Sequence, residues 1–201
     1  MNAHDLLWGM APDQLPADAP AWAQQVLLAG QPVVVRRAVA GAGRVAVGVR
    51  GSQRGERLAA EMPVASIKRR CSPEQLRGEG RAELAALQAL HAVTPFMDSL
   101  GLSWGPTGGV GYQLATGIAV LHHGSDLDLV LRTPAALTRV DAKALYQALC
   151  AAPCRIDLQL ETPYGAVALA EWSGASKRVL LKSRHGACLV SDPWSALELS
   201  A

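Results

Sequence analysis

Residues 125–131 alternate between polar and apolar side chains. Within this short segment, Asp126 and Asp128 alternate with Leu127 and Leu129. Successive side chains of a β-strand point to opposite faces of its sheet, so the pattern predicts a strand. The two leucines would then enter a core, and the two carboxylates would share the other face.

A second alternating segment lies downstream, over residues 155–161. Here Asp157 stands between Ile156 and Leu158. An acid inside an otherwise apolar strand pattern is expected to face a site, because burying an unpaired carboxylate is costly. The sequence therefore predicts a third acid on a neighbouring strand.

The remaining pattern alternates short strands with helices. Helices are predicted over residues 18–30, 81–93, 95–100 and 141–151, with Thr94 and Pro95 separating the second from the third. Strands are predicted over residues 32–40, 44–49, 64–67, 110–114 and 166–171. The first two of these strands are joined by the glycine turn at 41–43 and should form a hairpin.

This order of elements predicts an α+β protein with two domains. The hairpin-rich first part, residues 1–79, should form a small basic α+β domain. Residues 80–201, in which helices separate the strands, should form an α/β domain with a mixed sheet that carries the acids.

The composition is that of a protein with a substantial core. Half of the 201 residues are hydrophobic, and no apolar run is long enough to span a membrane. The N-terminus lacks a basic segment followed by an apolar one, which predicts a cytoplasmic protein. Four residues have the chemistry of zinc ligands, but their spacings are irregular and buried free thiols are common, so no zinc site is assigned. These residues are Cys150, Cys154, His185 and Cys188.

Positive charge is concentrated in the first domain although the net charge is only +2. Between Arg36 and Arg77 the basic residues outnumber the acidic ones by more than three to one. Such a segment is either a solvated face or a surface for a polyanion: a triphosphate substrate, an acidic carrier protein or nucleic acid. Nucleic acid is disfavoured because the segment lacks interleaved aromatic residues. Arg36 and Arg50 interrupt apolar runs near strand ends, where their guanidinium groups could bind phosphate oxygens or simply lie on the surface.

The paired acids and a glycine-rich loop suggest metal and phosphate chemistry. Asp126 and Asp128 would lie about 7 Å apart along the strand and would repel each other, so a bound cation such as Mg²⁺ is expected between them. Solvated acids at an exposed strand end are the alternative. In the loop at residues 104–111, Gly108 and Gly109 would let backbone N–H groups turn toward an anion, although a plain tight turn has the same composition.

Two glycines, an Asp-x-Asp strand and a third acid on a later strand resemble the nucleotidyltransferase superfamily related to polymerase beta. The resemblance implies that Asp126, Asp128 and Asp157 hold metal ions around a nucleoside triphosphate. It also implies that Gly108 and Gly109 form the phosphate loop. The spacing between this loop and the acid pair is longer here than is usual in the superfamily.

A closer resemblance runs nearly from end to end of the chain. The segments that carry it are residues 4–8, 32–38, 46–51, 104–117, 125–134 and 155–172. Together they are similar to the malonate decarboxylase holo-acyl-carrier-protein synthases, also called phosphoribosyl-dephospho-CoA transferases. The chain has Gly109 where serine is expected in relatives.

The resemblance implies a reaction, a cofactor and two partners. Mg²⁺ would be the cofactor, the donor would be triphosphoribosyl-dephospho-CoA, and the acceptor would be a serine of the apo acyl-carrier subunit of malonate decarboxylase. Ser125 would contact the substrate together with the two loop glycines. Two alternatives remain open: a nucleotidyltransferase for another acceptor, and a non-catalytic module that binds the carrier or a CoA-like ligand.

Overall fold

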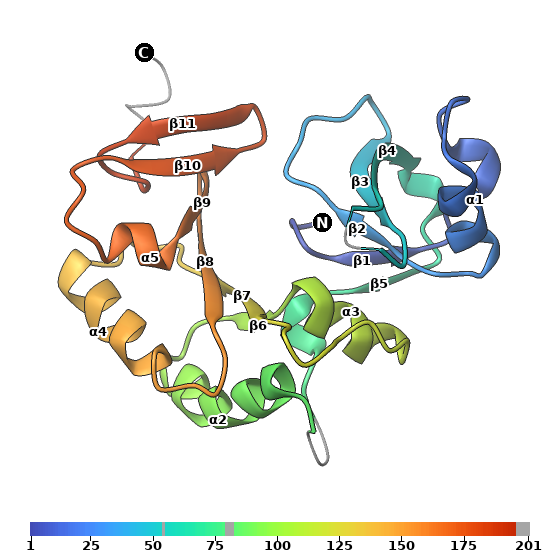
Figure 1. The fold of residues 1–201 in the computed structure, drawn as a ribbon. Coiled ribbons are helices and arrows are strands. Elements are labelled where there is room, and N and C mark those ends of the chain that lie inside the picture. The colour runs from blue at the N-terminus through green and yellow to red at the C-terminus, as the bar shows by residue number, and fades with distance from the viewer. Residues whose placement is uncertain (54, 79–82, 196–201) are drawn as a thin grey trace. The chain divides into compact units, whose positions relative to one another are not determined.

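Valine-rich and basic segments of the first 72 residues pair into one antiparallel sheet. The computed structural model describes residues 1–53, 55–78 and 83–195. The strands are β1 (Leu6–Trp8), β2 (Val33–Val35), β3 (Arg44–Arg50), β4 (Arg57–Pro63) and β5 (Arg69–Cys71). Their order across the sheet is β4-β3-β2-β1-β5 (Figure 1).

Alternation along these strands places one face of the sheet against the helix α1 (Ala21–Leu28). Val33 and Val47 are fully buried there, and Ala23 of α1 is part of the same cluster. Two short 3-10 helices, η1 (Pro12–Gln14) and η2 (Val64–Ser66), complete this part of the chain. β-branched side chains pack well on a pleated surface, which accounts for the valine content of the strands.

Residues from Pro73 onward build a second, six-stranded sheet with helices. The strands are β6 (Trp104–Pro106), β7 (Leu127–Arg132), β8 (Ile156–Thr162), β9 (Gly165–Ala168), β10 (Val179–Ser183) and β11 (Gly186–Val190). The helices are η3 (Pro73–Gln75), α2 (Ala85–Ser99), α3 (Gly108–Thr116), α4 (Arg139–Leu149) and α5 (Leu169–Trp172). Neighbouring strands follow the order β11-β10-β9-β8-β7-β6.

The second sheet is mixed. β7 and β8 pair in parallel, whereas β6–β7, β8–β9, β9–β10 and β10–β11 are antiparallel. A parallel pair needs a crossover, and α4 supplies it between β7 and β8 (Figure 1). The predicted α+β class with a mixed sheet in the second part is confirmed.

The chain divides into two compact units. Met1–Ser72 and Ala115–Gly117 form the first unit, and Pro73–Leu114 with Ile118–Ala201 form the second. Within the first unit, Arg69 Nη2 donates to the Ala115 carbonyl oxygen at 3.4 Å. The predicted boundary between residues 79 and 80 lies outside the described residues. Within those residues, no helix has both the length and the apolar character needed to cross a membrane.

The predicted strand over residues 64–67 is wrong. Residues 64–66 form the 3-10 helix η2, and the strand is β4, which ends at Pro63. β4 pairs with β3 over seven positions, from Arg44 opposite Pro63 to Arg50 opposite Arg57. The sequence signal for β4 is the alternation of Leu58 and Met62 with charged residues. The prediction relied instead on the apolar residues after Pro63.

The predicted strand over residues 110–114 is also wrong, because these residues belong to α3. A short apolar run does not distinguish a strand from a buried helix by periodicity. Val110 and Tyr112 are buried, and the first helical hydrogen bond runs from the Gly111 N–H to the Thr107 carbonyl, 2.8 Å away.

The predicted helix break at Thr94 and Pro95 does not occur. α2 continues through Pro95 to Ser99, and the Thr94 hydroxyl donates to the Leu90 carbonyl at 2.7 Å. Leu90, Val93 and Met97 are buried on one face of the helix, on both sides of the proline. Packing of this face offsets the hydrogen bond that proline cannot donate. The predicted helix start at residue 81 lies outside the described residues.

The predicted strand over residues 166–171 is too long. β9 ends at Ala168, and α5 begins at Leu169. The predicted helices near 18–30 and 141–151 correspond to α1 and α4. The predicted hairpin is formed by β2 and β3, but the predicted strand over residues 32–40 is too long, because β2 ends at Val35 and residues 36–43 connect the two strands.

Candidate active site

The strands β7 and β8 bring two of the predicted acids together. Their parallel register places Asp128 directly opposite Asp157. Neighbouring strands lie about 4.8 Å apart, so the two side chains leave the sheet side by side. Leu127 and Leu129 are fully buried, whereas Asp128 is only partly buried. The predicted alternation is confirmed over residues 127–129, whereas the strand begins at Leu127 and not at residue 125, so that Asp126 precedes it.

Asp126 lies just before β7 and is exposed. The residue after it is held by a backbone hydrogen bond, in which the Leu127 N–H donates to the Arg155 carbonyl at 3.0 Å. Burial raises the pKa of the nearby Cys154 thiol, the Leu127 backbone lowers it, and the negative charge of Asp126 raises it further. Asp126 is therefore within electrostatic reach of the segment that leads into β8.

Ser125 has a local structural partner. Its hydroxyl accepts a hydrogen bond from the His122 N–H at 3.0 Å, and its own N–H donates to the His122 carbonyl at 3.0 Å. These two bonds close the turn that precedes Asp126 and β7. Contact between Ser125 and a substrate stays a prediction.

Arg155 adds a positive charge that the sequence patterns did not assign to the site. Its Nη2 lies 3.7 Å from Oδ2 of Asp157, and 76 % of its side chain is exposed. The signal was available, because residues two apart on a strand share a face and Arg155 precedes Asp157 by two. An exposed guanidinium beside a carboxylate can turn to meet an incoming anion.

Gly108 fits closely against Asp128. It begins α3 with φ +56°, in the left-handed region that favours glycine. A Cβ atom at this position would overlap Oδ2 of Asp128. The Thr107 N–H donates to the Asp128 carbonyl at 2.8 Å, which joins the strand and the loop through the backbone as well. The structure thus brings the predicted glycine loop to one of the predicted acids.

The N-terminus of α3 lies beside the Asp128 carboxylate. The first N–H groups of an α-helix have no partner within the helix, and the dipole gives this end a partial positive charge. Gly109 lies in this first turn and is partly buried. A helix start of this kind suits an anion, either the Asp128 carboxylate itself or a phosphate group of a ligand.

A pocket of about 290 Å³ adjoins Asp157. Its lining combines polar and apolar surface in similar proportions, with polar groups from the segment before β8. The lining residues are Tyr146, Leu149, Cys150, Ala152, Cys154, Arg155, Ile156, Asp157, Leu158, Leu169 and Ala170.

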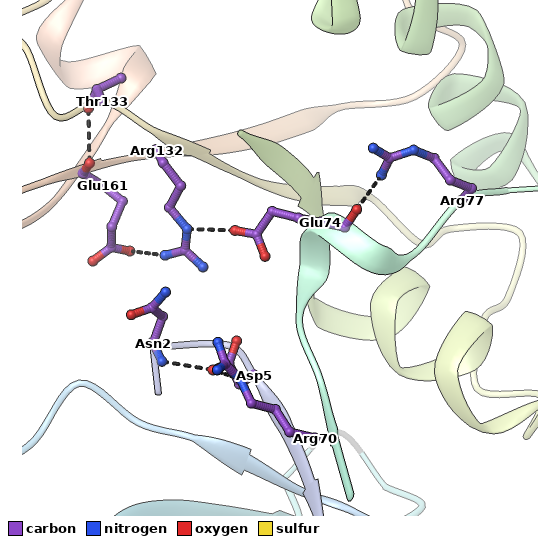
Figure 2. Close-up of polar contacts among 8 residues, drawn as sticks. All are labelled: Asn2, Asp5, Arg70, Glu74, Arg77, Arg132, Thr133 and Glu161. Carbon is purple, nitrogen blue, oxygen red and sulfur yellow. Dashed lines mark hydrogen bonds and ion pairs between the residues drawn. The ribbon is translucent and has the colours of Figure 1, made fainter. Parts of the chain in front are cut away.

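A charged network fixes the far end of β7 and β8 (Figure 2). Arg132 Nε lies 2.7 Å from Oε1 of Glu74, and its Nη1 lies 3.4 Å from Oε2 of Glu161. The Thr133 hydroxyl donates to the Glu161 carbonyl at 3.1 Å. Because Glu74 belongs to η3, this network holds η3 against the sheet. It stabilises the frame of the site.

Three carboxylates do not converge as a complete metal cage. No group of three or more histidine, cysteine, aspartate or glutamate side chains in residues 1–53, 55–78 and 83–195 is arranged to hold a metal ion. The four cysteines are free thiols. Binding of Mg²⁺ by Asp126, Asp128 and Asp157 stays a prediction.

The two predicted phosphate-binding arginines belong to the first unit. The stem of Arg36 crosses Gly48, where a Cβ would lie 3.4 Å from Cδ of the arginine. Arg36 also lines an open hollow of about 540 Å³ together with Arg44 and Glu61, which form an ion pair at 3.2 Å. Arg50 ends β3 opposite Arg57. A role of Arg36 and Arg50 in substrate binding stays a prediction.

Comparison with known proteins identifies relatives over nearly the whole chain. The family described as "Phosphoribosyl-dephospho-CoA transferase MdcG N-terminal domain" matches residues 2–73, and its C-terminal counterpart matches residues 74–193. A phosphoribosyl-dephospho-CoA transferase of Pseudomonas putida is 62 % identical over 98 % of this chain and 97 % of its own length. Proteins of the same name from Azotobacter vinelandii and Pseudomonas aeruginosa are 58 % and 52 % identical, over 95 % and 98 % of this chain and 93 % and 96 % of their own lengths. No solved structure matches the chain.

Proposed function

Because the chain belongs to the phosphoribosyl-dephospho-CoA transferase family and is a transferase, we propose that it modifies the acyl-carrier subunit of malonate decarboxylase. The donor in this proposal is triphosphoribosyl-dephospho-CoA, and the acceptor is a serine hydroxyl of the apo subunit. The observation that supports this chemistry best is the in-register pair of Asp128 and Asp157 beside the N-terminus of α3.

The proposed reaction is a nucleotidyl transfer. The serine oxygen forms a bond to the α-phosphorus of the donor, and the bond from this phosphorus to the bridging oxygen of pyrophosphate breaks. The serine proton passes to a carboxylate, for which Asp157 is the candidate, because it stands on the strand next to Asp128 and is partly exposed. The products are the phosphodiester-linked carrier and pyrophosphate.

Asp126, Asp128 and Asp157 are the residues that would hold Mg²⁺. Carboxylate oxygens are the ligands that this ion prefers, and it commonly takes one or two carboxylates and completes its shell with water and substrate phosphates. The adjacent Asp128 and Asp157 fit such a shared arrangement without a full protein cage. The ion would offset the charge on the triphosphate and on the departing pyrophosphate.

The rest of the site would position the phosphates. The first turn of α3 offers backbone N–H groups, and Gly108 keeps this turn close to Asp128 because it has no side chain. Arg155 would offset the negative charge on the side of Asp157. Both roles are binding and charge stabilisation, which is the main contribution of a protein to phosphoryl transfer.

The direct test is reconstitution of the transfer. The protein is incubated with the apo carrier subunit, triphosphoribosyl-dephospho-CoA and Mg²⁺, and both the mass of the carrier and the release of pyrophosphate are measured. We expect the carrier to gain the mass of one phosphoribosyl-dephospho-CoA group with one pyrophosphate released per carrier. Replacing the acceptor serine by alanine is the matched control.

Two results would contradict the proposal. An unmodified carrier with no pyrophosphate would argue against nucleotidyl transfer to this acceptor. Labelling of an unrelated apo carrier at the same rate would support the proposed reaction but contradict specificity for the malonate decarboxylase carrier. The second outcome corresponds to a nucleotidyltransferase with another acceptor.

A further inference from the structure

The first five residues contain a fully buried carboxylate next to a strained backbone. Asp5 has no exposed surface, and His4 before it has φ +74°, which is uncommon for a residue other than glycine. Backbone hydrogen bonds hold this conformation: the His4 N–H donates to the Val35 carbonyl at 3.0 Å, and the Val35 N–H donates to the Asp5 carbonyl at 2.8 Å. Strain that is held in this way often marks a functional position.

The buried carboxylate orients one arginine (Figure 2). Oδ2 of Asp5 accepts the Asn2 N–H at 2.7 Å and lies 2.8 Å from Nε of Arg70. Oδ1 of Asp5 has no hydrogen-bond partner within the described residues. A carboxylate is expensive to bury, and a pair of this kind is seldom the most stable solution for a site. In this structure the carboxylate fixes the position of the Arg70 guanidinium group.

Arg70 is held at one end and open at the other. The contact with Asp5 uses Nε, while 44 % of the Arg70 side chain stays exposed. A guanidinium group carries five N–H donors in a planar fork, so one contact through Nε leaves donors for a second partner. A guanidinium fixed by a buried anion loses little freedom when it binds, which favours tight and oriented recognition of a phosphate.

The surroundings of Arg70 reinforce this reading. Arg70 lies in β5, the strand at the edge of the first sheet, after the basic residues Lys68 and Arg69. The Arg69 guanidinium stacks over Trp8, with its central carbon 3.5 Å from the ring centroid. A row of cations on an edge strand attracts anions. Among the described residues, only Arg70 of this row has an ion pair with a buried carboxylate.

We propose that Arg70, positioned by Asp5, is a preformed binding group for a phosphate of a CoA-type ligand. The inference rests on the proposed function for the choice of ligand, since the donor carries a dephospho-CoA moiety with a diphosphate. It assigns Arg70 to ligand binding and Asp5 to positioning. It gives the first unit a part in recognition that is separate from the aspartates of β7 and β8.

The test measures binding of dephospho-CoA by calorimetry, without Mg²⁺, to the whole protein and its variants. Arg70→Ala alone would leave Asp5 buried without its cation and could unfold the chain, so two further variants are needed. Arg70→Lys keeps the charge and loses the planar fork. The double variant Asp5→Asn with Arg70→Met removes both charges and keeps similar volumes, and Arg57→Ala, an exposed arginine of β4, is the control for charge.

We expect the double variant to melt near the wild-type temperature and to bind dephospho-CoA at least about tenfold more weakly, the usual effect of losing a charged hydrogen bond. Arg70→Lys should lie between the two, and Arg57→Ala should bind within about twofold of wild type. Asp5→Asn alone should weaken binding less than loss of Arg70, because the cation remains but is no longer oriented.

The inference is overturned if the folded double variant binds dephospho-CoA as the wild type does, or if the wild type does not bind it. These results are distinct from failure of the proposed function. If the wild type labels the carrier and the double variant has an unchanged KM for the donor, Arg70 does not take part in recognition. The proposed transfer reaction would still stand. Loss of binding in the double variant supports the inference even when no carrier is labelled.

Discussion

Replacing Asp128 by asparagine should abolish most of the transfer while the fold remains intact. The substitution keeps the shape of the side chain and removes its charge, so the tight contact with Gly108 is preserved. Two effects on stability oppose each other. The charge at the start of α3 contributes about 0.3–1 kcal/mol. Repulsion from the adjacent Asp157 disappears with the charge, and this change stabilises the folded protein by a similar amount.

The expected loss of activity is much larger than the change in stability. Removing one group that stabilises developing charge in a preorganised site costs about 2.7–4 kcal/mol of transition-state free energy, or roughly 100- to 1000-fold in kcat. A net stability change below about 1 kcal/mol would shift Tm by no more than about 4 °C. The two measurements therefore separate a catalytic effect from a structural one.

The assay follows pyrophosphate release and carrier mass for wild type, Asp128→Asn and a control variant. Glu83→Gln is a suitable control, because it also neutralises one carboxylate of the second unit at an exposed position. We expect the control to retain wild-type kcat and KM. If Asp128→Asn released pyrophosphate within about fivefold of the wild-type rate, the assignment of this carboxylate to the reaction would be refuted.

Three further predictions address the geometry around this acid. Gly108→Ala should lower kcat and also destabilise the protein by about 1 kcal/mol or more, because a Cβ would overlap the carboxylate and φ is +56°; equal activity in transfer assays would exclude the close contact. Arg132→Met should remove the cation that two partly buried glutamates share and reduce the free energy of unfolding by about 2–3 kcal/mol in urea titrations, whereas an unchanged midpoint would show that the network contributes little. Burial and the charge of Asp126 raise the pKa of Cys154 above its ordinary value of 9.0, so alkylation of this thiol should accelerate only at higher pH, and Asp126→Asn should move the profile to lower pH. Identical profiles in both proteins would place Asp126 away from the thiol.

The chemistry of the second unit could be predicted where local rules determine it. The alternation in β7 and β8 gives both the strands and the faces of Asp128 and Asp157, because burial of the leucines leaves the acids no other direction. The contact of Gly108 with Asp128 could not be derived from spacing alone. It depends on β6 pairing with β7, and the length of the loop between α3 and β7 conceals this neighbourhood in the sequence.

The errors have a common physical cause, which is that packing decided against a local signal. Pro95 normally ends a helix, but the buried face that includes Val93 and Met97 extends across it. Residues 110–114 form a short apolar run that fits a strand or a buried helix, and in the structure Val110 and Tyr112 are buried on α3. The Asp5–Arg70 pair gave no signal in the pattern beyond a charged residue near each end of the first unit.

The apolar residues of β7 and β8 determine the register on which the candidate site depends. Leu127, Leu129, Leu158 and Leu160 are almost completely buried, and each contributes about 1.5–3 kcal/mol relative to an exposed position. A slip of one residue between the strands would turn one set of side chains to the opposite face. It would expose leucines of one strand, bury a carboxylate and separate the two acids. The free energy at stake, about 3–6 kcal/mol for two leucines, is comparable with the whole stability of many domains. The paired aspartates can therefore repel each other without moving apart, because the core beneath them holds the strands in place.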